Sequence, residues 1–166
     1  MLKRLLVISI ILFSLVACGG SDVVKPVLSP EEENTKKVFY NTAYDYEMAG
    51  DYLNAVEYYT KAIEIDETYE KAYYQRGRSY GLLGEDAKAV NDFTKVIKIN
   101  RDAENAYVGR ALGYLNLSTT ININDDAKGK QSLIRAALVD LDSTLEINPD
   151  NKLALKTQNE LFKRLE

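Results

Sequence analysis

Apolar and small residues recur along the chain at the spacing of amphipathic helices. Two neighbouring runs each place three such residues at i, i+4 and i+7, on one helix face: Phe39, Ala43 and Tyr46, and then Ala55, Tyr59 and Ala62. Gly50 lies between the runs, and glycine favours the left-handed conformation in which many helices end. The pattern predicts a unit of two antiparallel helices joined by a short turn.

The unit repeats along the chain with a period of 34 residues. An aromatic, a small residue and a tyrosine return at equivalent positions of the first helix: Phe39, Tyr73 and Tyr107; Ala43, Gly77 and Ala111; Tyr46, Tyr80 and Tyr114. A period of about 20–50 residues is typical of stacked supersecondary units. Because one hairpin cannot bury both of its faces, neighbouring units must stack.

An insert interrupts the third unit. Ala89 of the second unit and its counterpart Ala137 are 48 residues apart, which is 34 plus an insert of 14. The insert, near residues 118–131, is polar, and we expect a mobile loop or a lengthened helix start. Asn122, Asn124, Asp125 and Asp126 are faintly similar to a calcium loop, but the glycine and the closing glutamate fall at the wrong spacings, so we expect no metal site.

Residues 152–166 predict one more amphipathic helix at the end of the stack. Its apolar side is expected to contain Leu153, Leu155, Leu161, Phe162 and Leu165. Terminal units of a solenoid need a polar outer face, so this helix is expected to cap the stack.

The repeated positions resemble the tetratricopeptide repeat (TPR). The residues that carry the resemblance are Phe39, Ala43, Tyr46, Gly50, Ala55, Tyr59 and Ala62, and then Tyr73, Gly77, Tyr80, Gly84, Ala89 and Phe93. Glu67 and Arg101 depart from the proline that is usual in the family, which only Pro149 retains. The resemblance implies an all-α solenoid of helical hairpins. Its repeats would span about 36–69, 70–103 and 104–151, followed by a capping helix at 152–166.

The N-terminal residues have the features of a secretory signal. Lys3 and Arg4 precede an apolar run over residues 5–16, which is too short to cross a bilayer comfortably. The tetrapeptide at 15–18, LVAC, resembles a bacterial lipobox. The resemblance implies cleavage before Cys18 and lipid attachment to this single cysteine. The alternative is an ordinary cleaved signal that ends near a cysteine.

The chain is thus expected to have three parts: a signal peptide at 1–17, a lipidated Cys18 with a flexible tether at 18–28, and a TPR domain at 29–166. Ser29, Pro30 and Glu32 have the arrangement of a helix start, because serine caps the helix and the glutamate completes a capping box.

Composition narrows the chemistry that the domain can perform. The chain contains no histidine, and its one cysteine is assigned to lipid, so His- or Cys-based catalysis and zinc sites are not expected. The formal charge is −4, or −6 without Lys3 and Arg4, which disfavours nucleic acid as a partner. The acids Glu57, Glu64 and Asp92 are expected on exposed helix faces. We therefore expect no enzyme and no cofactor.

A binding role remains, and the TPR resemblance implies which side chains face the inner groove. The expected partner-binding residues are Lys37, Tyr40, Tyr44, Lys71, Tyr74 and Arg78, continued in the third unit by Asn105, Val108, Gly109 and Leu112. Tyrosine and arginine are enriched at interface hot spots. The alternative is that these tyrosines only pack against the next hairpin. The basic clamp with which some relatives bind acidic chaperone tails is absent, because its positions read Tyr40, Tyr44, Gln75, Asn105 and Gly109.

These inferences predict a lipid-anchored scaffold of the bacterial cell envelope that binds a protein or peptide in its concave groove, and an assembly factor is one such role. A self-associating structural lipoprotein, and hence a homo-oligomer, is the main alternative, and a small envelope hydrolase is another. Gly19 follows the lipobox cysteine, whereas the known inner-membrane retention signal resembles an aspartate there. The expected location is the outer membrane, facing the periplasm, or the outer face of the plasma membrane in a bacterium with one membrane.

Overall fold

The computed structural model describes residues 24–120 and 127–165, with side chains up to Phe162. These residues form seven helices and no strand, and no described helix is long and apolar enough to cross a membrane. The helices are α1 (Pro30–Met48), α2 (Tyr52–Ile65), α3 (Glu70–Leu82), α4 (Asp86–Ile99), α5 (Glu104–Thr120), α6 (Ala127–Ile147) and α7 (Lys152–Leu165). The lipobox and Cys18 lie outside the described residues.

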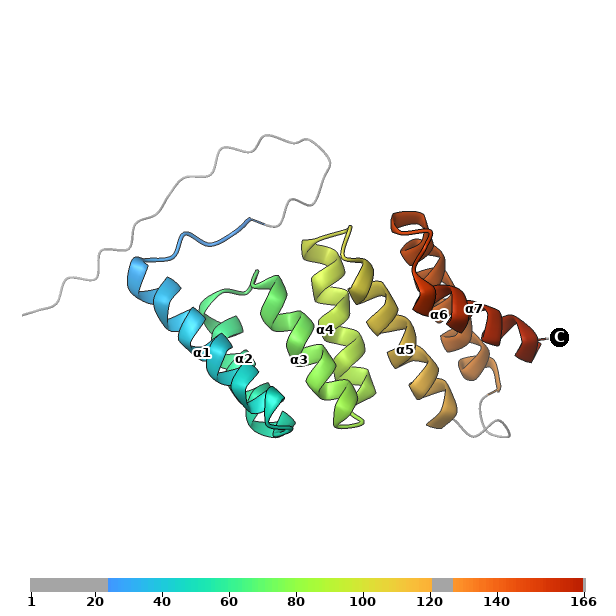
Figure 1. Cartoon of the computed structure of the whole chain (residues 1–166), viewed down its shortest axis with the longest axis horizontal. Coiled ribbons are helices and arrows are strands. Elements are labelled where there is room, and N and C mark those ends of the chain that lie inside the picture. The colour runs from blue at the N-terminus through green and yellow to red at the C-terminus, as the bar shows by residue number, and fades with distance from the viewer. Residues whose placement is uncertain (1–23, 121–126, 166) are drawn as a thin grey trace, which may run out of the picture.

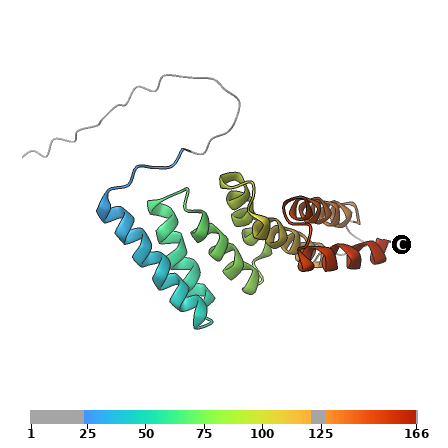
Figure 2. The ribbon, with the colours of Figure 1, turned by 45° about the horizontal axis from the view of Figure 1, so that its top comes forward.

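The helices form a row of stacked hairpins (Figure 1). Helices α1 and α2, α3 and α4, and α5 and α6 pair within hairpins, and each second helix also packs on the first helix that follows it. Helix α7 lies beside α6 at the C-terminal end of the row (Figure 2). The all-α hairpin solenoid predicted from the sequence is confirmed.

Helix α1 begins at the predicted capping box. The Ser29 Oγ accepts a hydrogen bond from the Glu32 N–H at 3.2 Å, and the Glu32 carboxylate accepts one from the Ser29 N–H at 2.8 Å. Helices α1 and α3 are each followed by a glycine with positive φ, 79° at Gly50 and 75° at Gly84. Only glycine adopts this conformation without strain, so these two residues set the hairpin turns.

Small residues bring the paired helices together around one large side chain of each second helix. Ala43 of α1 and Ala55 of α2 are fully buried, and Tyr59 fills the space beside them. In the next unit Phe93 lies against Gly77 of α3 and Gly109 of α5. A Cβ added at Gly109 would lie 2.7 Å from the Phe93 ring, so this close approach requires glycine.

Two buried ion pairs connect first and second helices within the second and third units. Arg76 donates two hydrogen bonds to Asp92, at 2.8 and 2.7 Å, and Arg110 makes the equivalent pair with Asp140 at the same distances. Asp92 is only 4% exposed. The prediction that Asp92 lies on an exposed face is therefore wrong, because its carboxylate is the buried partner of Arg76. Glu57 and Glu64 are exposed as expected.

The described parts of the third-unit insert are helical. Residues 118–120 extend the C-terminal end of α5, and residues 127–131 begin α6. The insert therefore lengthens both helices of the third hairpin. Residues 121–126, which include the asparagines and aspartates compared with a calcium loop, lie outside the described residues.

Helix α7 buries a different face from the one expected. Ala154 and Leu161 are buried against the third unit, whereas Leu153, Leu155 and Phe162 remain 49%, 39% and 49% exposed. The outer face of α7 is thus partly apolar, and the expectation of a polar cap is wrong in this respect. Leu165 lies beyond the described side chains.

Replacing Asp92 tests the buried ion pair. We expect Asp92→Ala to lower the free energy of unfolding by about 3 kcal/mol, because the buried Arg76 guanidinium loses its carboxylate. Chemical denaturation followed by circular dichroism measures the change. The control Glu57→Ala removes an exposed pair with Lys61 and should change the free energy of unfolding by no more than about 0.5 kcal/mol. Equal effects of the two changes would contradict the assignment.

Candidate partner-binding groove

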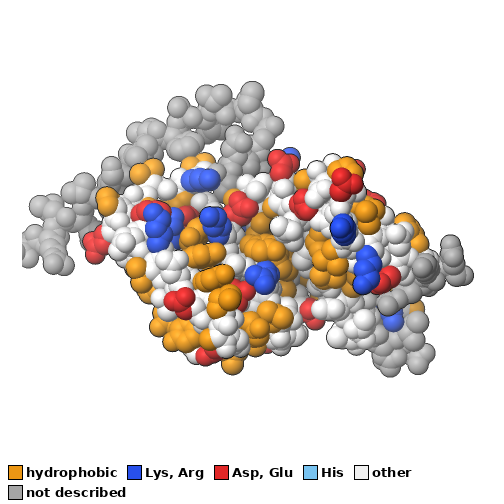
Figure 3. All heavy atoms as spheres, in the orientation of Figure 1, with side chains coloured by type: hydrophobic (Ala, Val, Ile, Leu, Met, Phe, Trp, Pro, Cys, Tyr) orange, Lys and Arg blue, Asp and Glu red, His pale blue; other side chains and the backbone are white. Residues whose placement is uncertain are grey.

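The first helices of the hairpins form one continuous surface, which we call the groove. Helix α1 contacts α3, and α3 contacts α5, although each pair is separated by a second helix in the sequence. This arrangement places the first helices on the inner side of the stack. Hydrophobic side chains gather over the middle of the face shown in Figure 3, with lysine and arginine side chains scattered among them.

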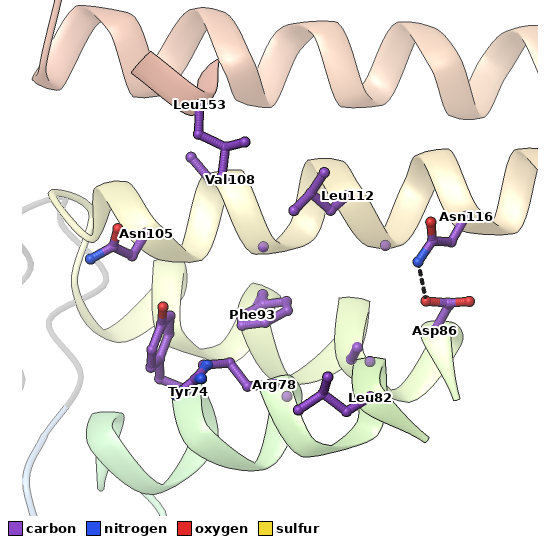
Figure 4. A pocket seen from close by; sticks show the side chains of 15 residues that line it. Tyr74, Arg78, Leu82, Asp86, Phe93, Asn105, Val108, Leu112, Asn116 and Leu153 are labelled. Atoms are coloured by element: carbon purple, nitrogen blue, oxygen red, sulfur yellow. Dashed lines mark hydrogen bonds between the residues drawn. The ribbon is translucent and has the colours of Figure 1, made fainter. Parts of the chain in front are cut away.

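A hollow of about 370 Å³ lies in the groove between α3 and α5. Tyr74, Arg78 and Leu82 line it from α3, and Leu153 of α7 extends toward Val108 of α5 at its far side (Figure 4). The other lining residues are Gly77, Gly81, Asp86, Ala89, Phe93, Asn105, Gly109, Leu112, Gly113 and Asn116. Gly81 is exposed and a Cβ added there would meet nothing within 4 Å, so the hollow has room for a ligand side chain.

The centre of the hollow is apolar and its ends are polar. The Phe93 ring lies between the two helices, and Leu112 borders the opening (Figure 4). At one end Asn116 donates a hydrogen bond of 2.9 Å to the Asp86 carboxylate. At the other end lie Arg78 and Asn105. The hollow can therefore accept a large apolar side chain whose neighbouring polar groups meet hydrogen-bonding partners.

Arg78 is already engaged in a network that joins α1, α2 and α3. Its Nη1 lies 3.1 Å from Glu47 Oε1 and donates a hydrogen bond of 2.8 Å to Gln75. Glu47 Oε2 accepts a hydrogen bond of 2.7 Å from the Tyr59 hydroxyl. Burial, together with this hydrogen bond to Glu47, raises the pKa of Tyr59 well above its usual range, so the phenol stays a neutral donor. Arg78 therefore compensates a buried carboxylate.

Two of the predicted groove tyrosines also belong to the core. The Tyr40 ring lies 5.5 Å from the Tyr59 ring and 5.3 Å from the Tyr69 ring, between centroids. Tyr74 lies 5.8 Å from Phe93 in the same measure. Both rings are half-buried, and burial raises the pKa of both hydroxyls. Tyr40 and Tyr74 therefore pack against core side chains of the hairpins and also line the groove.

The remaining predicted residues are exposed. Tyr44 is 42% exposed, and Lys37 pairs with Glu33 on its own helix at 3.1 Å. Lys71 is exposed and makes no ion pair with any described residue. These three side chains are exposed, so a change at any of them should have little consequence for the fold.

The predicted residues do not form one site. Tyr74 and Arg78 line the hollow between α3 and α5, whereas Tyr40, Lys71 and Tyr74 border a neighbouring hollow of about 430 Å³. Lys37 lies farther along, beside the tether residues 25–28. Sequence reasoning missed the contributions of Phe93 and Leu153. Leu153 was detectable, since it follows the groove residue Asn105 by 48 positions.

Two segments of the chain, residues 37–69 and 70–102, match the family model of the tetratricopeptide repeat. They correspond to the hairpins α1–α2 and α3–α4. These two hairpins therefore have the sequence of tetratricopeptide repeats. No protein of curated function matches the sequence.

Solved TPR domains share the fold. The first TPR of Spaghetti (RPAP3), bound to the HSP90 peptide SRMEEVD, has a TM-score of 0.68 and 22% identity, over 80% of this chain and 94% of that chain. The Arabidopsis OM64 TPR domain has a TM-score of 0.65 and 22% identity, over 80% and 98%. YrrB, described as a TPR protein with an unusual peptide-binding site, has a TM-score of 0.62 and 21% identity, over 75% and 57%. At these identities the similarity establishes the fold alone.

The Arg78 network makes a prediction that separates structural from exposed groove residues. We expect Arg78→Ala to lower the free energy of unfolding by about 1–2 kcal/mol, because the buried Glu47 carboxylate loses its cation. Tyr44→Ala should change it by no more than about 0.5 kcal/mol. Adding Glu47→Gln to Arg78→Ala should recover part of the loss. Urea denaturation of the three variants measures this, and no recovery in the double variant would contradict the network.

Proposed function

We propose that this protein is an interaction scaffold whose groove holds a segment of a protein partner. The observation that carries the proposal is the hollow between α3 and α5, which is lined by the apolar side chains of Phe93, Val108 and Leu112 and where Gly81 adds no side chain to fill the space. Such a cavity accepts an apolar side chain, and the polar groups at its ends orient the backbone on either side.

Two of the similar structures support this proposal, because they were solved as complexes with a chaperone or a chaperone peptide. The first TPR of Spaghetti was solved with an HSP90 peptide, and a TPR domain of yeast Sti1 with Hsp70. Their clamp chemistry is not carried over, because Gln75, Asn105 and Gly109 stand at clamp positions here. The proposed ligand is therefore anchored by an apolar side chain in the hollow, with Tyr44 and Lys71 as further contacts.

The proposed setting is the bacterial cell envelope, with the protein held to a membrane by lipid on Cys18. This part rests on the sequence LVAC at 15–18 behind a short basic start. Several acyl chains anchor far more firmly than one, since each buried methylene contributes about 0.8 kcal/mol. The tether at 18–28 would let the repeat domain reach partners near the membrane surface.

Crosslinking in cells tests the groove. A photoreactive residue at Leu112, which borders the hollow, should crosslink to a partner protein, whereas one at the outer position Glu57 should not. Gly81→Met should abolish the Leu112 crosslink, because its side chain fills the hollow. A Cβ at Gly81 meets nothing within 4 Å, so the fold should tolerate this change. Gly81→Ala is the matched control and should leave the crosslink intact.

Two outcomes of this experiment would count against the scaffold. Equal crosslinking from Leu112 and Glu57 would mean that the groove is not a specific site. Crosslinks only to other copies of this chain would favour the self-associating structural lipoprotein.

The lipid anchor has its own test. We expect Cys18→Ala to release the protein from membranes or to leave an uncleaved precursor, because no sulfur remains to accept the lipid. Membrane fractionation and labelling with radioactive palmitate measure this, with Ser21→Ala as the matched control. Unchanged membrane retention together with an unlabelled wild-type protein would contradict the lipobox assignment.

A further inference from the structure

Helix α7 occupies the place of the first helix of a fourth unit. Its residues follow those of α5 by 48 positions, the spacing between equivalent residues in the second helices α4 and α6. Ala72, Ala106 and Ala154 are equivalent in this register. All three are fully buried, at the point where a first helix packs on the preceding unit.

A repeated polar contact supports this register. Arg76 of α3 donates to Thr60 Oγ1 at 2.9 Å, and Arg110 of α5 donates to Thr94 Oγ1 at 3.1 Å. The equivalent residues at the end of the stack are Gln158 and Asp142, and Gln158 donates to Asp142 at 2.6 Å. Each contact joins a first helix to the second helix before it, 16 residues earlier. Helix α7 thus lies on the preceding second helix in the same register as α3 and α5.

The apolar residues that α7 leaves exposed are those that normally meet a second helix. Leu155 and Phe162 correspond to Phe39 and Tyr46 of α1. There, both rings pack on Tyr58 of α2, at centroid distances of 6.2 and 5.5 Å. No described helix covers the equivalent face of α7, which ends the row in Figure 2.

The charge of this face indicates what would cover it. Lys152 is equivalent to Lys36, whose Nζ lies 2.9 Å from Asp66 just beyond the end of α2. Helix α7 carries four basic residues and one acidic residue, in a chain of formal charge −4. A complementary helix would therefore place a carboxylate opposite Lys152.

Each second helix of the chain presents the same pattern to its first helix. A small residue, a large apolar residue and a small or β-branched residue occur at i, i+4 and i+7, and all are buried: Ala55, Tyr59 and Ala62; Ala89, Phe93 and Val96; Ala137, Leu141 and Thr144. Because these helices are already committed to their own hairpins, a second folded copy has none to offer. This favours a helix of another protein as the occupant.

We infer that the α7 face formed by Lys152, Leu155, Asn159 and Phe162 binds an amphipathic helix of a partner protein. The partner helix lies antiparallel to α7, as α2 lies on α1, and completes a fourth hairpin. It carries small residues at i and i+7, a large apolar residue at i+4 and a carboxylate that meets Lys152. Asn159 stands where α1 has Ala43, so a small partner residue opposite it provides the needed room. This surface is distinct from the groove.

A peptide with the sequence of residues 51–66, DYLNAVEYYTKAIEID, is the probe, since it contains the α2 pattern and Asp66. Fluorescence anisotropy should show saturable binding of the labelled peptide to the full chain. Leu155→Ser with Phe162→Ser should weaken it at least about tenfold, because the apolar contacts are lost. Val139→Ser, a change at another exposed apolar residue, should leave binding unchanged, as should Gly81→Met in the groove.

Charge reversal tests the register of the bound helix. Lys152→Glu should weaken binding of the peptide, and the peptide variant Asp66→Lys should restore it with that protein. If the peptide binds the variant with Leu155→Ser and Phe162→Ser as tightly as the unchanged protein, the proposal is overturned, since the peptide would then be replacing α2 in its own hairpin. Absence of binding would overturn it as well. A dimer seen by analytical ultracentrifugation and dissolved by the same two changes would assign the face to a second copy instead.

Discussion

The structure depends on the close approach of helix backbones around one large side chain of each second helix. Phe93 shows the constraint most clearly, because it lies against Gly77 of its own hairpin and Gly109 of the next. One ring thereby joins two units, and no side chain other than hydrogen fits at Gly109 without displacing it. The solenoid is held together by repetition of this contact, with Tyr59 and Leu141 at the equivalent positions.

A different glycine, Gly81, opens the candidate site. Gly81 stands where the first unit has Glu47 and the third has Leu115, so α3 has no side chain at this position of the groove. In the first unit the Glu47 carboxylate fills that space and holds Arg78 and Tyr59. The core and the groove therefore depend on different glycines, because Gly77 and Gly109 admit the Phe93 ring whereas Gly81 leaves space in the groove.

Polar contacts decide how the units are oriented. The pairs Arg76 with Asp92 and Arg110 with Asp140 join the two helices of a hairpin, while the same arginines reach back to the preceding unit. A buried ion pair adds little net stability but penalises any arrangement that separates its charges. These contacts hold each unit in one register on the last, and they continue into α7 through Gln158.

The sequence by itself determined the hairpin unit, its period, the capping box and the glycine turns. These features depend on local spacing and on backbone conformations that few residues adopt. It could not place Asp92, because a lone acid on a helix looks solvated until the arginine that pairs with it is brought alongside, 16 residues away in the chain. Nor could the sequence distinguish Tyr40 and Tyr74, whose rings are half-buried, from the exposed Tyr44. Only the tertiary structure decided these points and the uncovered face of α7, because burial and ion pairing depend on which helices become neighbours.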